Sequence, residues 1–126
     1  MRTARFLLAI VLAANGLMML FAPETWYRWV PGVADTGPLN THFVRDIGCA
    51  YLVCAAAFVW LTLDAGAWPA ALAGAAFLAM HALLHIGEAV TGGRDMDHLI
   101  ADLPGVFLLP ALALCLAWPR RRKQIT

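Results

Sequence analysis

Four long apolar runs without Asp, Glu, Lys or Arg alternate with short polar segments along the chain, at residues 6–23, 47–63, 65–87 and 103–119. A helix needs about 20 largely apolar residues, and roughly 17 at the least, to cross the hydrocarbon core of a bilayer. Each run reaches this length once its flanks are included. The pattern predicts an all-α integral membrane four-helix bundle. It would form a single domain over residues 1–126, with spans at about residues 4–23, 41–63, 67–90 and 99–119.

The first run also has features of a secretory signal peptide, because Arg2 and Arg5 precede it. However, no small-x-small cleavage site follows it cleanly, and Asn15 and Gly16 interrupt its apolar core. We therefore expect this run to be retained as the first span.

The composition agrees with a membrane protein. The 126 residues are 62% hydrophobic and 13% charged, whereas a water-soluble domain carries about 25% charged residues. This excludes a small soluble domain, and the net charge of +1 gives no reason to expect a nucleic-acid partner. The three cysteines lie inside apolar runs, which indicates small core residues rather than a disulfide framework.

Basic residues gather at the two ends of the chain, at Arg2, Arg5 and residues 120–123. An even number of spans places both ends on one side, and the positive-inside rule makes that side cytoplasmic. Seven of the eight acidic residues then fall on the other side. We expect a multi-pass protein of the bacterial inner membrane with both termini cytoplasmic and the lipid bilayer around its spans.

The segment between the first two spans combines Trp26, Tyr27 and Trp29 with Pro-Gly and Gly-Pro turns. This predicts a short interfacial helix followed by turns. Asn40 or Thr41 would cap the second span. Pro110 interrupts the backbone hydrogen bonds of the fourth span, so we expect a bend there.

The third span carries small residues at four-residue spacing, with Gly74 four residues after Ala70 and Ala79 four residues after Ala75. Small residues let a neighbouring helix approach closely. We therefore expect this span in the centre of the bundle.

All four histidines fall in the non-cytoplasmic third of the predicted bundle, each with a carboxylate at helical spacing. Residues three, four or seven apart share a helical face. Ionisable groups at membrane depth cost about 2.5–3.5 kcal/mol on insertion scales, so they usually face the bundle interior and have partners there. We predict one shared pocket that opens to the periplasm. Its members would be His42 with Asp46, His81 and His85 with Glu88, and His98 with Asp102.

Imidazole and carboxylate suit a first-row transition metal, and ligands four residues apart on facing helices are how helix bundles build metal sites. The pattern predicts a transition metal ion (Zn, Cu or Fe) in this pocket, with redox chemistry as one use. Arg45 lies on the same stripe as His42 and would support a ligand from outside the coordination sphere. No known nucleophile or phosphate-loop motif is present, so no catalytic residue is assigned.

Two other interpretations of the cluster stand beside the metal site. It could be a hydrogen-bonded brace in a non-catalytic accessory subunit, or a path for protons or small solutes, because histidine titrates near neutral pH. Asp102 also has an alternative role. With Pro104 two residues later, Asp102 could cap the fourth helix, which would leave His98 in a loop.

Residues 15–23 (NGLMMLFAP), the Trp26-Tyr27 and Pro31-Gly32 pairs and residues 42–48 (HFVRDIG) resemble small four-helix bacterial inner-membrane proteins of unknown function. More loosely, they resemble the DoxX-like superfamily. The resemblance covers the first span and the start of the second. It implies a four-helix inner-membrane bundle and, because DoxX is associated with quinone-linked sulfur oxidation, a quinone cofactor. A homo-oligomer and a complex with a membrane partner subunit both stay open.

Overall fold

The computed structural model describes residues 1–93 and 96–118, and every regular element within them is helical. Four stretches are long and apolar enough to cross a membrane: Arg2–Phe21, Thr41–Leu63, Ala65–Val90 and Asp97–Ala117. The prediction of four long apolar helices is confirmed, with bounds within a few residues of those expected. In chain order the elements are α1 (Arg2–Phe21), α2 (Pro23–Trp29), η1 (Val33–Thr36), α3 (Thr41–Leu63), η2 (Ala65–Ala67), α4 (Trp68–Val90), α5 (Met96–Asp102), the π-helical segment η3 (Leu103–Leu108) and α6 (Leu109–Ala117).

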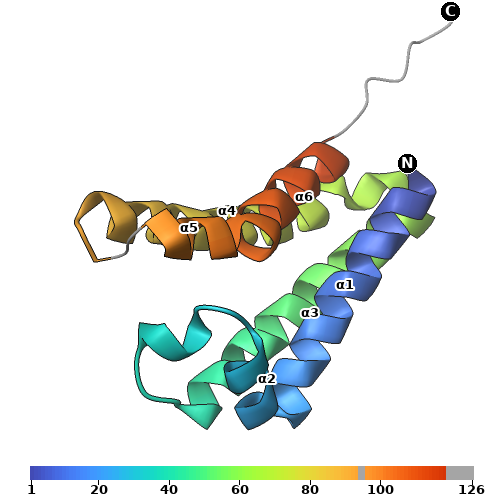
Figure 1. The fold of residues 1–126 in the computed structure, drawn as a ribbon. Helices are drawn as coiled ribbons and strands as arrows, with labels where there is room; N and C mark the ends of the chain where they lie inside the picture. The colour runs from blue at the N-terminus through green and yellow to red at the C-terminus, as the bar shows by residue number, and fades with distance from the viewer. Residues whose placement is uncertain (94–95, 119–126) are drawn as a thin grey trace, which may run out of the picture.

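The helices form two antiparallel pairs, α1 with α3 and α4 with α6 (Figure 1). The pairs meet at the end that carries the N-terminus and η2, which we call the inner end. They diverge toward the end that carries α2, η1 and α5, which we call the outer end (Figure 1). At the inner end the side-chain Nε of Arg5 donates a hydrogen bond of 2.9 Å to the carbonyl oxygen of Leu116. The first and last helices therefore have their terminal ends on the same side of the bundle.

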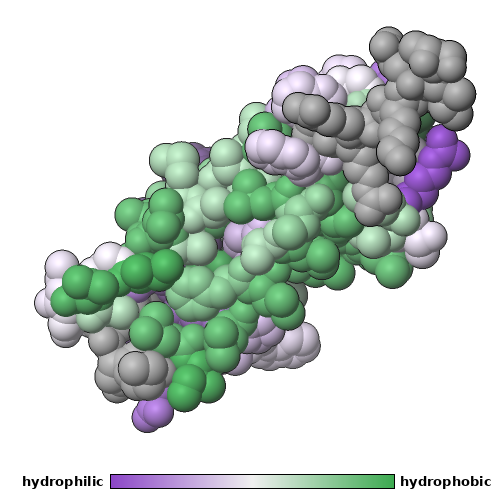
Figure 2. Space-filling view, turned by 90° about the horizontal axis from the view of Figure 1, so that it is seen from above, coloured by the Kyte–Doolittle hydropathy of each residue, from purple (hydrophilic) through white to green (hydrophobic). Residues whose placement is uncertain are grey.

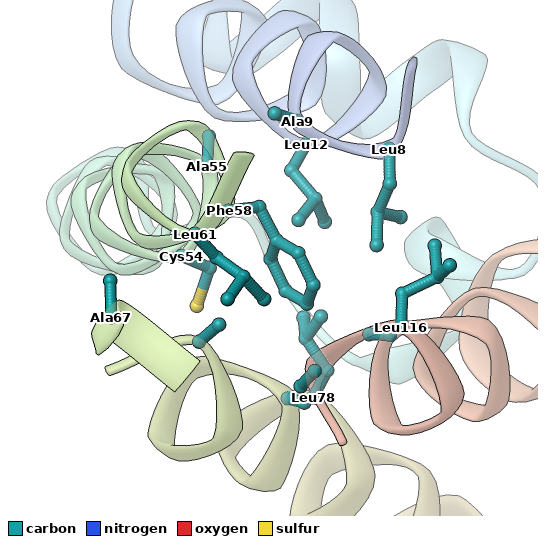
Figure 3. Close-up of a cluster of buried hydrophobic side chains, with 14 residues drawn as sticks. Leu8, Ala9, Leu12, Cys54, Ala55, Phe58, Leu61, Ala67, Leu78 and Leu116 are labelled. Atoms are coloured by element: carbon teal, nitrogen blue, oxygen red, sulfur yellow. The ribbon is translucent and has the colours of Figure 1, made fainter. Parts of the chain in front are cut away.

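A buried apolar cluster joins the two pairs in their inner half (Figure 3). Leu12, Phe58 and Leu78 are its largest fully buried side chains, and alanines of α4 and α6 let the helices approach around them. At the outer edge of the cluster the rings of Tyr51 and Phe77 meet edge to face, with centroids 6.2 Å apart. The hydrophobic contact between the pairs is thus concentrated toward the inner end.

Within the α1–α3 pair, the backbones cross at Gly16 and Gly48. A Cβ added to Gly16 would lie 2.8 Å from the carbonyl oxygen of Gly48, and one added to Gly48 would lie 2.9 Å from that of Gly16. Between α3 and α4, a Cβ on Gly74 would lie 3.3 Å from Cys54, whose thiol donates to the Gly74 carbonyl oxygen. Gly74 lies where α4 approaches α3, as expected of a small residue. The approach of α1 to α3 at Gly16 and Gly48 is closer, with Cβ distances of 2.8 and 2.9 Å against 3.3 Å.

Local signals at the helix ends agree with the sequence. The side chain of Asn40 accepts a hydrogen bond from the backbone N–H of Phe43 and caps α3. The sequence predicts a bend at Pro110, and the structure has a π-helical segment, η3, that ends at Leu108, two residues before this proline. Because Pro110 has no N–H to donate to the carbonyl oxygen of Val106, regular α-helical bonding is broken at this point.

The short helix α2 folds back onto α1 through the side chain of Asn15. The indole N–H of Trp26 donates to Asn15 Oδ1 over 2.9 Å, and the Asn15 amide lies 3.6 Å from the sulfur of Met19. A polar side chain in an apolar helix is stabilised by such partners.

We expect Trp26→Phe to lower the free energy of unfolding by about 0.5–1.5 kcal/mol, the usual value of one hydrogen bond. Reversible unfolding in detergent, followed by circular dichroism, measures the loss. Trp29→Phe is the matched control, because Trp29 lies on the same helix and is 74% exposed. Equal losses in the two variants would show that the bond to Asn15 contributes nothing.

Candidate functional site

A short polar contact at the outer end joins His85 on α4 to Asp102 at the end of α5. His85 Nδ1 lies 2.6 Å from Asp102 Oδ2, and the two side chains are only 12% and 7% exposed. Asp102 has helical backbone angles and makes no capping bond. The alternative role of Asp102 as the cap of the fourth helix is therefore wrong, and His98 lies with Asp102 on α5.

The pairing determines how the imidazole of His85 can act. An ionised carboxylate only accepts hydrogen bonds, so Asp102 holds the ring hydrogen on Nδ1. The lone pair of Nε2 is then directed away from Asp102. A carboxylate that orients an imidazole in this way prepares the second nitrogen for accepting a proton or binding a ligand.

His81 lies one turn further toward the inner end of α4 and contacts His85. Their ring centroids are 4.7 Å apart and the ring planes are inclined by 74°. Glu88 follows three residues after His85, so these three side chains are neighbours along one face of α4. The stripe runs from within the bundle to its outer surface.

A second histidine–aspartate contact lies at the outer surface. His98 Nε2 on α5 is 3.3 Å from Asp35 Oδ2, which η1 carries. Both residues line an open depression of about 310 Å³, together with Thr36, Glu88 and Gly93. The sequence gives no signal for Asp35 as a site residue, because it lies in a turn-rich segment without helical spacing to any histidine.

The remaining candidates lie apart from this group. His42 Nε2 is 3.5 Å from Asp46 Oδ2 on the same helix, and these side chains are 89% and 61% exposed. Arg45 Nε donates to the carbonyl oxygen of Leu20 at the end of α1. The seven candidate ligands are therefore arranged as three side chains in contact where α4 meets α5 (His81, His85, Asp102), two that line the depression (Glu88, His98) and an exposed pair (His42, Asp46).

Across residues 1–93 and 96–118, no three His, Cys, Asp or Glu side chains are arranged to hold a metal ion. The metal centre therefore stays a prediction from the sequence, as does the quinone that the family resemblance implies. The geometry does show an imidazole, His85, in contact with a carboxylate and with a second imidazole beside it, on a helix whose next turn lines an open depression.

No protein-family model, curated protein or solved structure matches this chain. The DoxX-like resemblance accordingly stays a prediction, and the function has to be argued from the geometry.

Proposed function

We propose that this chain is a four-span membrane protein with a one-sided acid–base site, in which His85 exchanges protons with the aqueous phase at the outer end. The observation that carries the proposal is the short contact between His85 Nδ1 and Asp102 Oδ2 in a nearly buried position. Asp102 fixes the tautomer of the ring by accepting a hydrogen bond from Nδ1. His85 Nε2 is then the atom that takes up and releases the proton.

The neighbours of His85 supply a route for that proton. His81 contacts the ring from the inner side. On the outer side Glu88 lines the open depression, so water can reach its carboxylate. A proton moving between Glu88 and His85 would pass between neighbours on one helical face.

The route is one-sided because the inner half of the bundle is apolar. Inward from His81, the buried residues of α4 are Leu78, Ala75 and Ala71, which pack in the cluster that contains Phe58 and Leu12. The site therefore suits a protein that protonates or deprotonates a substrate from one face of the membrane better than it suits a proton channel.

The membrane placement is supported by length, composition and surface. Four helices are long and apolar enough to span a bilayer, and the face seen in Figure 2 is mainly hydrophobic with hydrophilic residues toward its ends. Basic residues at both ends of the chain favour cytoplasmic termini and an inner membrane. The outer end, with the acid–base site, would then face the periplasm.

A non-catalytic brace is the second candidate, and one observation favours it. The His85–Asp102 contact links α4 to α5, which lie on the same side of the bundle, at the outer end beyond the last α4 residue of the buried apolar cluster, Leu78. A brace needs the hydrogen bond but no proton exchange, so the two functions differ in a measurable property of the ring.

Nitrogen NMR of ¹⁵N-histidine-labelled protein in lipid nanodiscs tests the proposal. We expect the neutral ring of His85 to carry its hydrogen on Nδ1, and both ring nitrogen signals to move as the buffer is taken from alkaline to acidic. In Asp102→Asn the preference for Nδ1 should be lost, because the amide can donate as well as accept. In His42→Ala, which alters an exposed pair elsewhere, the signals of His85 should be unchanged.

If the His85 ring stayed neutral at every pH of the buffer, the acid–base function would be contradicted and the brace would be the supported function. Proteoliposomes under a pH gradient test the one-sidedness separately. Proton flux equal to that of protein-free vesicles is expected, whereas faster flux that His81→Ala abolishes would replace the one-sided site with a transmembrane path.

A further inference from the structure

The segment of residues 30–40, which we call the strap, connects α2 to α3 and contacts α5 of the other pair at the outer end. The hydroxyl of Tyr27 on α2 lies 2.7 Å from the carbonyl oxygen of Gly37 in the strap and 3.2 Å from that of Ala34. The hydroxyl has one hydrogen and can donate it to either oxygen. Tyr27 therefore links α2 to the strap by a hydrogen bond that can pass from one carbonyl oxygen to the other if the strap moves.

Two glycines flank the short helix η1 within the strap. Gly32 has φ +77° and Gly37 has φ +133°, conformations that residues with a side chain rarely adopt. Pro31 and Pro38 adjoin them and stiffen the chain on the outer sides. Rotation at the two glycines would move η1 as a unit, which is the arrangement expected of a hinged segment.

The strap reaches the other pair at two places. Asp35 contacts His98 on α5 over 3.3 Å. A Cβ built on Gly32 would be 4.0 Å from Asp102 Oδ1, so the Gly32 backbone lies beside the carboxylate that holds His85. The open depression follows this seam, with Asp35 and Thr36 on one wall and Glu88, Gly93 and His98 on the other.

We propose that the strap is a hinged lid over the His85–Asp102 pair, closed by the Asp35–His98 contact, and that its opening along the depression controls the access of water and substrate. The inference rests on the proposed acid–base function. The closed lid shields the carboxylate of Asp102 at Gly32. The open lid extends the depression toward His85.

Exchange of the carbon-bound hydrogen at C2 of each imidazole into D2O, read by mass spectrometry, measures the access of solvent to each histidine ring. At one fixed alkaline pD, we expect His98→Ala and Asp35→Ala to speed the exchange at His85 about two- to fivefold, the size typical of removing a partly exposed ion pair. Backbone amides of residues 30–40 should exchange faster by a similar factor. His42→Ala removes the exposed contact with Asp46 and should change neither rate.

Amide exchange in α1 and α3 must stay as in the wild type, which shows that the variants are folded. Faster amide exchange in the strap without any change at the His85 ring would overturn the lid, because the strap would then be a loose loop that covers nothing. Unchanged rates in both places would overturn it as well. C2 exchange proceeds through the protonated ring, so a His85 ring that never protonates gives no measurable C2 exchange in any variant. That outcome, with unchanged nitrogen signals, identifies a failure of the acid–base function. Measurable C2 exchange that is equal in the variants and the wild type identifies a failure of the lid.

Discussion

Replacing Gly48 with alanine is expected to destabilise the α1–α3 pair by about 1–3 kcal/mol, the usual cost of overpacking a close-packed contact. The new methyl group would lie 2.9 Å from the carbonyl oxygen of Gly16 and 2.9 Å from Cβ of Met19. Both are fixed atoms of the opposite helix rather than the ends of flexible side chains. The helices would have to separate, and separation loses the dispersion contacts along the whole crossing.

The chain contains its own control for this substitution. Gly87 lies on α4, and a Cβ there would meet nothing within 4 Å. Since alanine is favoured over glycine in a helix by about 0.5–1 kcal/mol, Gly87→Ala should be neutral or stabilising. Equilibrium unfolding in mixed micelles of detergent and SDS measures both variants. A Gly48→Ala protein as stable as Gly87→Ala would show that α1 and α3 do not cross at this position.

The four long helices could be predicted from the sequence because their signal is local. A run of about 20 apolar residues without charge has few stable alternatives to a helix, and a side chain such as Asn40 caps the residues directly after it. Neither inference needs knowledge of which helix neighbours which. This is why the predicted and observed bounds agree to within a few residues.

The helix crossings could not be predicted in the same way. Alanine and glycine occur at four-residue spacing on several faces of this chain, and many of those faces would permit close approach. Gly16 and Gly48 are distinguished by their position opposite each other, which depends on the rotation of α1 against α3. The contacts of Gly74 were anticipated only because its span is unusually rich in small residues.

The sequence points to most residues of the candidate site but not to their pairing: Asp35 is missed, and His42 and Asp46 lie apart from the others. Spacing of four residues correctly places His81 beside His85 and His98 on the same helix as Asp102. The contacts that define the site join different elements, His85 to Asp102 and His98 to Asp35. These depend on how α5 lies against α4 and on the path of the strap, and neither is encoded in the periodicity of one helix.

The second large effect is expected at Asp102. Asp102→Ala should lower the free energy of unfolding by about 1–3 kcal/mol, because the ring N–H of His85 is left without this acceptor in a nearly buried position. Asp46→Ala is the matched control. This substitution removes the carboxylate from the His42–Asp46 contact, which lies within α3. Both side chains there are largely exposed, so a change in the free energy of unfolding near zero is expected.

A double-mutant cycle separates the pair from the other contacts that Asp102 makes. If the hydrogen bond to His85 accounts for most of the loss, His85→Ala combined with Asp102→Ala should be less destabilised than the sum of the single variants, with a coupling energy of about 0.5–3 kcal/mol. The reason is that the second substitution removes the group left unsatisfied by the first. Strict additivity would contradict this and show that the 2.6 Å contact contributes nothing to stability.

The cycle also bears on why a bundle would keep this pair. A buried polar pair is a weak source of stability, because apolar side chains of similar volume often stabilise a core as well or better. We therefore expect His85→Phe combined with Asp102→Leu to match or exceed the stability of the wild type in the same unfolding assay. A protein that only needed a brace could have used such an apolar contact. A double variant far less stable than the wild type would instead indicate that the polar contact is required for packing α5 against α4.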